Sequence, residues 1–367
     1  MDVSVVTSGH DLADARLHRE VAALVGLGIR VEVLALGHGV DAPAGSSART
    51  WRRRGPAGRA ALAGEMAVRA RGRVLLAHDP DSAVAAGAVV RATGRRLVVD
   101  VHEDYGALLH DRPWARRMHG LPGILARGLV RTFQEVAARA DLTVVADDHV
   151  PPLRARHRLL LPNVPYPGML PAPALPDPRP RAVYVGDVRA SRGLFAMFAA
   201  LRGAPDWTLD VVGPVAPADR PAMEAALDAD PDLARRVRLH GRRPPVPAWA
   251  DAAGAWCGLV LLADTPAFRR AVPSKLAEYL ACGLPVVTTD LPRQADVVGT
   301  TGAGSVVPTG DDEQVGAAVA EVLRGWSQQP GTLSMARESA RREGSCGPAA
   351  QAPALYQAFA GAVADLL

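Results

Sequence analysis

Short runs of apolar and β-branched residues alternate with longer Ala- and Arg-rich stretches through most of this chain. In the first 161 residues these runs are Val3–Val6, Arg30–Leu36, Arg73–Ala77, Leu97–Val101, Leu142–Ala146 and Leu159–Leu161. The stretches between them, such as Ala15–Leu27 and Ala83–Ala92, space their apolar residues as a helix does. Continuous apolar strands separated by helices predict a parallel sheet that is covered on both faces.

The same plan returns in the second half of the chain. Its expected strands are Ala182–Val185, Thr208–Val212, Val237–His240, Leu259–Ala263, Val286–Thr288 and Ser305–Val307. Between the halves, residues 162–180 contain eight prolines, a density that excludes a regular helix or a central strand. We therefore expect an α/β chain with two doubly wound, Rossmann-like domains, at residues 1–161 and 181–350, joined by a proline-rich linker. Ligands of such sheets bind beyond the carboxyl ends of the strands, so a cleft between the two domains is the expected active site.

Charge is distributed unevenly along the chain, and Lys275 is its only lysine among 42 basic residues. Residues 1–161 carry 23 Arg against 17 acidic residues, whereas residues 162–367 carry 19 basic against 21 acidic residues. The basic first half favours anionic ligands or surfaces. Only 16 aromatic residues are spread along the chain, too few for the stacking platform of a nucleic-acid-binding protein.

No apolar run reaches the roughly 18 residues that a membrane span requires, and Met1–Val6 reads as a buried strand rather than as a secretory signal. We therefore expect a cytoplasmic protein. The Arg-rich segments 49–59 and 112–131 contain apolar residues as well, which suits peripheral contact with an anionic membrane, although most such faces are simply solvated.

The cysteines are odd in number and far apart, which argues against a disulfide framework or a cysteine zinc site. They are Cys257, Cys282 and Cys346.

The segment Asp264–Val287 is the sharpest candidate for chemistry, and it is expected to form a strand end, a loop, a short helix stopped by Gly283 and the next strand. Ser274 is suited to cap this helix, which places Lys275 in the first turn. A cation there opposes the helix dipole at a cost of about 0.3–1 kcal/mol. A bound phosphate would reverse that sign, and Glu278 on the same face is suited to accept hydrogen bonds from sugar hydroxyls. The competing interpretation is a solvated lysine and a glutamate favourably placed near a helix N-terminus.

A second candidate for anion binding is Gly186–Leu194, again at a junction between a strand and a helix. Gly186 permits close approach of the backbone, and Arg192 can make a forked contact with phosphate oxygens. Together with Lys275, this gives two cations at neighbouring strand ends. Such a pair suits a diphosphate whose negative charge grows as a bond to it breaks.

In the first domain, the polar segments His78–Asp81 and Asp100–Tyr105 each follow an expected strand. The functional interpretation places His102 at the cleft in contact with the substrate. The competing interpretation is that Asp79 or Asp81 caps the following helix, which we favour for Asp81. A metal site built from His78, Asp79, Asp81 and His102 lacks a diagnostic ligand spacing, so no metal is expected.

Three common motifs are missing from the sequence. The loop Thr7–Asp14 after the first strand contains Gly9 but not the G-x-G-x-x-G pattern of nicotinamide dinucleotide sites. The chain also lacks the G-x-x-x-x-G-K-[ST] loop of nucleoside triphosphatases and the G-x-S-x-G turn of serine hydrolases. These absences argue against all three classes.

Five segments in order along nearly the whole chain carry a resemblance to a known family. They are Asp14–Glu20, Asp100–Glu103, Leu161–Val164, Tyr184–Gly193 and Pro273–Val287. In this order they resemble the retaining GT4 family, within the GT-B superfamily of nucleotide-sugar glycosyltransferases.

The resemblance implies that the C-terminal domain binds a nucleotide diphosphate sugar and that the N-terminal domain receives the acceptor. Arg192 and Lys275 would then hold the diphosphate, Glu278 would contact the ribose, and His102 would reach over the donor sugar. The resemblance also implies that the chemistry needs no metal or other cofactor, and that the leaving phosphate helps to take the acceptor proton. Residues 351–367 would form a terminal helix that packs back on the first domain.

The chain departs from the family at one position. Many relatives carry two glutamates separated by seven residues; Glu278 matches the second, but Arg270 stands at the first. Relatives with a P-x-K-x-x-E-Y segment lack that first glutamate too. The expected function is thus a retaining, hexosyltransferase-like glycosyltransferase whose acceptor is a small metabolite, a glycan or a lipid.

Three alternatives to this function remain open. A nucleotide-sugar epimerase or hydrolase on the same fold would consume the donor without an acceptor. An inactive donor-binding partner subunit would bind the nucleotide without transferring a sugar. A metal-dependent transferase that uses Asp79 and Asp81 would lose its activity on chelation.

Overall fold

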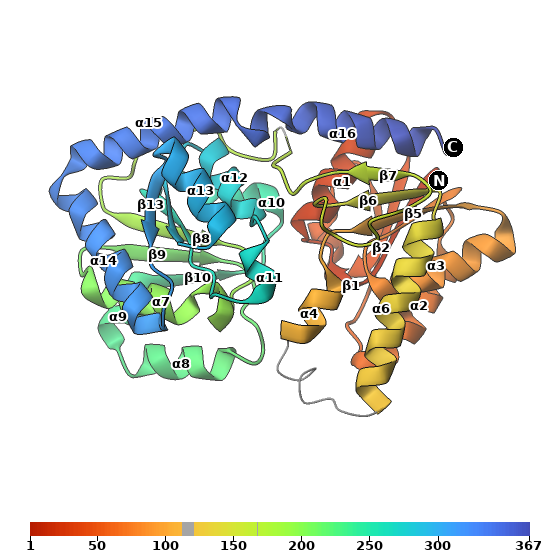
Figure 1. Cartoon of the computed structure of the whole chain (residues 1–367), viewed down its shortest axis with the longest axis horizontal. Helices are drawn as coiled ribbons and strands as arrows, with labels where there is room; N and C mark the ends of the chain where they lie inside the picture. The colour runs from red at the N-terminus through yellow and green to blue at the C-terminus, as the bar shows by residue number, and fades with distance from the viewer. Residues whose placement is uncertain (112–120, 167) are drawn as a thin grey trace. The chain divides into compact units, whose positions relative to one another are not determined.

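The computed structural model describes residues 1–111, 121–166 and 168–367. The chain divides into two compact units, the first comprising Met1–Asn163 with Pro353–Leu367 and the second comprising Val164–Ala352. Each unit has its own sheet and its own helices (Figure 1). In this division most of the proline-rich segment belongs to the second unit, and its role as a linker remains a prediction.

The first unit has a seven-stranded sheet in the order β3-β2-β1-β4-β5-β6-β7, with every neighbouring pair parallel. Its strands are β1 (Val3–Asp11), β2 (Val31–Leu36), β3 (Ser47–Trp51), β4 (Val74–Ala77), β5 (Arg96–Val101), β6 (Leu142–Val145) and β7 (Arg158–Leu160). Its helices are α1 (Ala15–Gly26), α2 (Pro56–Arg69), α3 (Pro80–Thr93), α4 (Tyr105–Asp111) and α6 (Leu121–Arg139), with a 3₁₀ turn η1 (Gly39–Asp41). The central strands β2 and β4 are buried at every position, as continuous apolar runs require.

The second unit has a six-stranded parallel sheet in the order β10-β9-β8-β11-β12-β13. Its strands are β8 (Arg181–Val185), β9 (Thr208–Val212), β10 (Val237–Gly241), β11 (Cys257–Val260), β12 (Val286–Thr289) and β13 (Gly304–Val307). Its helices are α7 (Leu194–Gly203), α8 (Arg220–Asp228), α9 (Pro231–Arg236), α10 (Pro245–Ala250), α11 (Pro266–Arg269), α12 (Ser274–Ala281), α13 (Pro292–Thr301), α14 (Asp312–Gln328) and α15 (Pro330–Cys346), with the 3₁₀ turn η2 (Ala190–Arg192). The expected α/β fold with two parallel sheets is confirmed.

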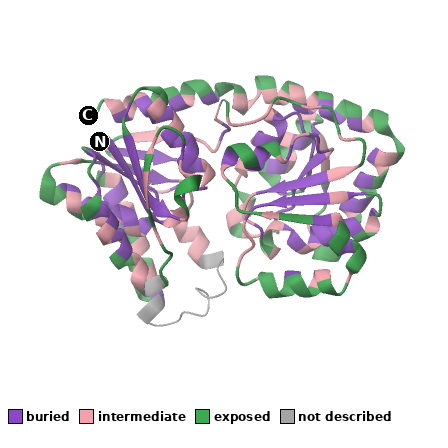
Figure 2. Ribbon diagram, turned by 180° about the vertical axis from the view of Figure 1, so that it is seen from behind, coloured by how far each residue is buried: buried purple, intermediate pink, exposed green. Residues whose placement is uncertain are grey.

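The second sheet is covered on both faces because successive strand residues point to opposite sides. In β8, Ala182 and Tyr184 join one core cluster, which includes apolar residues of α7 and α14. Val183 and Val185 join the other cluster, which includes apolar residues of α12 and α13. The central strands of both sheets are accordingly buried, while the outer helices expose one side (Figure 2).

The last helix, α16 (Pro348–Ala364), returns the chain to the first unit, to which residues from Pro353 onward belong. Tyr356, Phe359 and Val363 of this helix are buried. Their spacing of three and four residues places them on one face of the helix.

Sequence analysis missed β3, which is a polar edge strand without an apolar run. Its five residues, Ser47–Trp51, are exposed or half-buried, so burial provides no hydrophobic pattern to detect.

Part of the Arg-rich segment 112–131, at residues 112–120, lies outside the described residues. Within the described part of the chain, no helix combines the length and apolar character needed to cross a bilayer.

Candidate functional site

In the second unit, the chain makes a close turn where β8 ends. Gly186 follows Val185 with φ +129°, and a Cβ atom at Gly213, after β9, would overlap the Gly186 carbonyl. A Cβ atom at Gly186 itself would lie 3.1 Å from Nζ of Lys275. Glycine is therefore required at this strand end by both backbone conformation and lack of space.

The helix that carries Lys275 begins one residue earlier than the predicted Ser274 cap implies. Ser274 is the first residue of α12, and Pro273 stands at the N-cap without a side-chain hydrogen bond. The prediction that Ser274 caps the helix is therefore wrong. The fixed φ of proline, −67° here with ψ 133°, supplies the extended backbone of an N-cap, which moves the serine into the first turn beside Lys275.

The ammonium of Lys275 is buried without a hydrogen-bond partner in the described part of the chain. The residue is only 7% exposed, and its Nζ lies 3.5 Å from the centroid of the Tyr184 ring. Burial and the nearby Arg192 guanidinium hold the pKa of Lys275 well below its ordinary value, against the opposing pull of Asp187 and Glu278. A buried cation that lacks a counter-ion within hydrogen-bond distance is typical of a binding site awaiting an anion.

The turn η2 brings Arg192 close to the Lys275 ammonium. Gly193 follows with φ +86°, and a Cβ atom there would clash with Leu261 next to β11. The Arg192 Nε atom is buried and has no hydrogen-bond partner among the residues that the structure describes. Burial raises the pKa of Tyr184 to about 12, and the Arg192 charge acts against this shift. Gly186, Arg192 and Lys275 thus converge at the Tyr184 ring, as their positions at neighbouring strand ends predict.

Glu278 lies one turn after Lys275 on α12 and is 5% exposed. The next residue, Tyr279, fixes this helix to the sheet. Its hydroxyl accepts a hydrogen bond from the Val185 amide at 2.8 Å and donates one to the Val183 carbonyl at 3.2 Å. Sequence analysis missed Tyr184 and Tyr279 as parts of the site, although both lie within the segments that carry the family resemblance.

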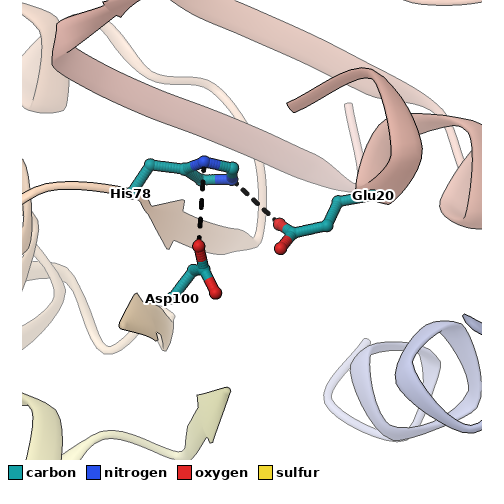
Figure 3. A group of neighbouring side chains, drawn as sticks. All are labelled: Glu20, His78 and Asp100. Atoms are coloured by element: carbon teal, nitrogen blue, oxygen red, sulfur yellow. Dashed lines mark ion pairs between the residues drawn. The ribbon is translucent and has the colours of Figure 1, made fainter. Parts of the chain in front are cut away.

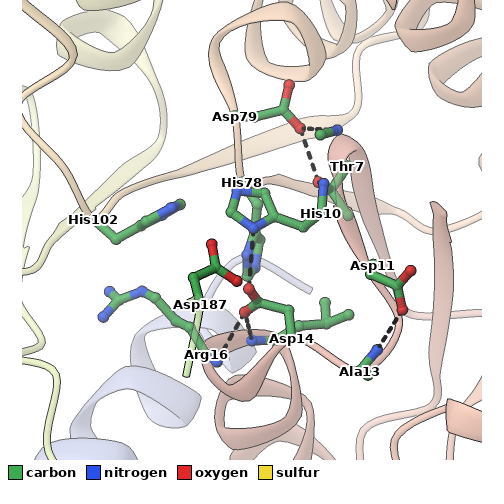
Figure 4. A network of polar contacts seen from close by, with 12 residues as sticks. Thr7, His10, Asp11, Ala13, Asp14, Arg16, His78, Asp79, His102 and Asp187 are labelled. Carbon is green, nitrogen blue, oxygen red and sulfur yellow. Dashed lines mark hydrogen bonds and ion pairs between the residues drawn. The ribbon is translucent and has the colours of Figure 1, made fainter. Parts of the chain in front are cut away.

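In the first unit, Asp79 connects the end of β4 to the second half of β1 (Figure 4). Its carboxylate accepts hydrogen bonds from the Thr7 hydroxyl at 2.8 Å and from the Ser8 and Gly9 amides at 2.9 and 3.2 Å. It also caps α3 by accepting from the Ser82 amide at 3.1 Å. Burial raises the pKa of Asp79, but the cationic neighbours prevail and the pKa falls to about 2.

The cap of α3 is thus Asp79, and the preference for Asp81 as the cap is wrong. Asp81 lies in the first turn of α3, and its carboxylate is 2.8 Å from Nε of Arg59. The reason is local: the N-cap needs an extended backbone, which Asp79 has, and Pro80 takes the first helical position. Asp81 is therefore two residues too late to cap the helix.

His102 follows β5 and is held by Asp100. Its Nδ1 lies 2.8 Å from Oδ2 of Asp100, and its ring is 5.0 Å from the ring of His10, measured between centroids. His10 lies near the end of β1, and its Nδ1 is 3.1 Å from a carboxylate oxygen of Asp14. Burial alone would lower the pKa of His10, but Asp14 raises it to about 9. Sequence analysis missed His10, and the available signal was its position beside Gly9 near the end of the first strand.

Glu20, His78 and Asp100 form a buried group whose ligand-type atoms lie within 4.8 Å of one another (Figure 3). His78 Nε2 is 2.9 Å from Glu20, and His78 Nδ1 is 4.0 Å from Asp100. The Arg16 guanidinium already pairs with both carboxylates, at 3.1 Å from Glu20 and 2.6 Å from Asp100. Ion pairs with Arg16 therefore account for this group, which differs from the His78, Asp79, Asp81 and His102 set considered from the sequence.

The comparisons with known proteins agree with this architecture. Residues 179–325 match the family model described as glycosyl transferases group 1. No curated protein matches the chain. Solved structures that share its fold include sucrose-phosphate synthase from Thermosynechococcus elongatus, with a TM-score of 0.67 and 16% identity over 100% of this chain and 98% of that chain.

Two further structures share the fold. Anabaena HepE, in a complex described as containing UDP and glucose, has a TM-score of 0.69 and 14% identity, with 100% of both chains covered. WaaG, a glycosyltransferase involved in lipopolysaccharide biosynthesis, has a TM-score of 0.64 and 18% identity over 98% of this chain and 99% of that chain. The fold is therefore that of the GT-B glycosyltransferases, as expected.

Proposed function

We propose that this chain, whose residues 179–325 match the family model of group 1 glycosyl transferases, transfers a sugar from a nucleotide diphosphate sugar to an acceptor. The observation that carries the proposal is the buried, unpartnered ammonium of Lys275 beside the Arg192 guanidinium, as described above for the mapped residues. The UDP and UDP-glucose complexes of HepE, which has the same fold, support a donor of this class.

The proposed donor site combines the partial positive charge of a helix N-terminus with the full charges of two side chains. The first amides of α12 and the Lys275 ammonium both favour an anion, and Arg192 adds a second cation. Bond cleavage leaves a nucleoside diphosphate that carries more negative charge than it did in the donor, so cations fixed beforehand stabilise the transition state more than the ground state. In this scheme Glu278 contacts the ribose, His102 contacts the donor sugar, and Gly186 and Ser274 leave room for the phosphates.

The finer parts of the proposal follow the family resemblance. The reaction retains the anomeric configuration, and the leaving phosphate takes the acceptor proton without a metal ion. The acceptor is a small metabolite, a glycan or a lipid bound by the first unit. Full activity after exhaustive chelation would eliminate the metal-dependent alternative.

Calorimetric titration with UDP and with uridine tests the diphosphate assignment. Lys275→Ala and Arg192→Ala should weaken UDP binding by roughly ten- to one-hundred-fold, because each removes a charge-assisted contact, while uridine binding stays within about twofold of wild type. Arg269→Ala is the matched control, because Arg269 is 60% exposed and pairs with Asp264. An equal loss of UDP and uridine binding in the Lys275 and Arg192 variants would reject the assignment.

A thermal-shift screen of uridine, guanosine, adenosine and thymidine diphosphates identifies the base, since bound ligand raises the apparent stability.

The inactive-partner alternative has one observation in its favour. Arg270 is exposed after α11, at the position where many relatives carry a glutamate, and its carbonyl accepts a hydrogen bond from Arg293 at 2.6 Å. A chain of this kind binds a nucleoside diphosphate but produces no glycoside from any acceptor pool. Product analysis by mass spectrometry separates the transferase from this alternative, and loss of donor without a glycoside product identifies the epimerase or hydrolase.

A further inference from the structure

Asp100 stands at the centre of a buried set of contacts in the first unit. It is fully buried in β5, and its carboxylate accepts hydrogen bonds from Arg16 Nε at 2.8 Å and Arg16 Nη2 at 2.6 Å. The same carboxylate lies 2.8 Å from Nδ1 of His102. A forked guanidinium contact fixes the plane of the carboxylate as well as its position.

The Arg16 guanidinium is itself held from several directions, so it cannot swing away from Asp100 without breaking other contacts. Its Nη1 donates to the Leu161 carbonyl at 3.2 Å and to Oδ1 of Asn163 at 3.0 Å, and its Nε lies 3.1 Å from Glu20. Helix α1, strand β5 and the chain after β7 thus meet at one side chain.

The charge of Asp100 determines which nitrogen of His102 carries a proton. Burial by itself raises the pKa of Asp100, but Arg16 and His102 lower it far below the ordinary range, so the carboxylate is ionised. An ionised carboxylate only accepts hydrogen bonds, so Nδ1 of His102 must be the donor. In the neutral imidazole, Nε2 is then the nitrogen that presents a lone pair. The Tyr105 hydroxyl lies 3.5 Å from Nε2, which is too long for a strong hydrogen bond.

We infer that Asp100 and Arg16 are positioning residues that set the tautomer and the ring orientation of His102. The inference rests on the proposed function, in which His102 contacts the donor sugar. It adds that two residues remote in sequence determine which ring nitrogen of His102 makes that contact. Neither residue needs to touch the substrate. The alternative is that the Arg16–Asp100 pair contributes to stability alone.

The first test uses the wild-type full-length chain and needs no substrate. Long-range ¹H–¹⁵N NMR spectra of histidine-labelled protein report the protonated nitrogen of each imidazole, and His102→Gln assigns the signal. We expect His102 to be the Nδ1–H tautomer when neutral. An Nε2–H tautomer in the wild type would overturn the inference.

The second test measures catalysis in Asp100→Asn. The asparagine amide can donate to Nδ1, which favours the Nε2–H tautomer. We expect kcat for nucleotide release, measured with whichever of UDP-, GDP-, ADP- or dTDP-glucose the wild type consumes fastest, to fall on the order of ten-fold, with little change in KM and with an altered pH profile. In a His102→Gln background, Asp100→Asn should cause no further loss of kcat. Equal losses in both backgrounds, or an unchanged tautomer in Asp100→Asn, would mean a role in stability alone.

The two tests separate failure of the inference from failure of the proposed function. A wild type that binds none of the four nucleoside diphosphates contradicts the proposed transferase, but the NMR spectrum of the same protein still decides the role of Asp100. Arg16→Lys is the second variant if Asp100→Asn does not fold. Lysine cannot make the forked contact, so we expect a mixture of His102 tautomers in that variant, and an unchanged Nδ1–H population would contradict the part assigned to Arg16.

Discussion

The Lys275 ammonium lies 3.5 Å from the centroid of the Tyr184 ring, which places the cation over the aromatic face. A cation over an aromatic face gains about 0.5–2 kcal/mol. This gain is small beside the cost of burying an ammonium without a hydrogen bond. The buried ammonium therefore carries a net electrostatic cost that a bound anion would reduce, and the next two predictions test this cost.

Lys275→Met should stabilise the ligand-free protein while it impairs binding of a nucleoside diphosphate. The pKa of Lys275 is lowered in the folded state, so the folded state binds fewer protons than the unfolded state below the ordinary value of 10.5. Stability contributed by this residue therefore falls as the pH drops below 10.5, and the methionine variant avoids that loss. Thermal unfolding should give the variant a higher Tm at neutral pH, with a difference that shrinks as the pH approaches 10.5. A lower Tm than wild type at neutral pH would show that the burial cost is absent.

Binding of UDP should be accompanied by uptake of a proton at a pH that lies above the lowered pKa of Lys275 and below its ordinary value of 10.5. The diphosphate restores the charged form of Lys275 because an opposite charge at close range raises the pKa of an amine. Titration calorimetry in buffers with different ionisation enthalpies measures this uptake directly. Lys275→Met serves as the control and should take up less than the wild type. Binding heats that do not depend on the buffer would contradict the prediction.

Gly186→Ala should weaken UDP binding and destabilise the second unit. The new Cβ atom would lie 3.1 Å from Nζ of Lys275, and the backbone has φ +129°. Strain of this kind costs about 1–3 kcal/mol. Gly241→Ala is a matched control, because Gly241 also has a positive φ, of +70°, but nothing lies within 4 Å of its added Cβ. Both variants should lower the urea midpoint, whereas only the Gly186 variant should change the affinity for UDP.

Asp79→Asn should remove part of the acid sensitivity of the protein. The pKa of Asp79 falls from 3.8 to about 2 on folding, so its carboxylate contributes stability above 3.8 that is lost as the pH falls towards 2. The shift corresponds to about 2 kcal/mol. Asp81→Asn is the control with the opposite sign, because the pKa of Asp81 is raised in the folded state. Urea unfolding as a function of pH should show a flatter acid limb for Asp79→Asn only.

Much of the fold was predictable because buried parallel strands must be apolar throughout. The same rule identified β1, β2 and β4 and missed β3, whose polar residues lie at the sheet edge. The convergence of Lys275, Arg192 and Gly186 was also predictable, since each follows or faces the carboxyl end of a strand in one sheet. The chemical roles of these residues remain predictions.

The errors in the site arose where an offset of one or two residues decides which residue caps a helix. Ser274 and Asp81 were both plausible caps, but Pro273 and Asp79 have the extended backbone that a cap requires. Contacts between distant segments leave even less trace in a sequence. Arg16 and Asp100 are 84 residues apart, and a sequence pattern does not indicate that an Arg on a helix will meet an Asp on one particular strand.

The double hydrogen bond of the Tyr279 hydroxyl has a consequence for redesign of this chain. It joins α12 to the backbone of β8 across 94 residues. The two segments that carry Lys275 and Gly186 are therefore expected to move together as a rigid unit. Loops around these two hydrogen bonds could be exchanged while the relative positions of Gly186 and Lys275 stay fixed. Tyr279→Phe would remove both hydrogen bonds and loosen the proposed phosphate site without removing any of its proposed binding groups.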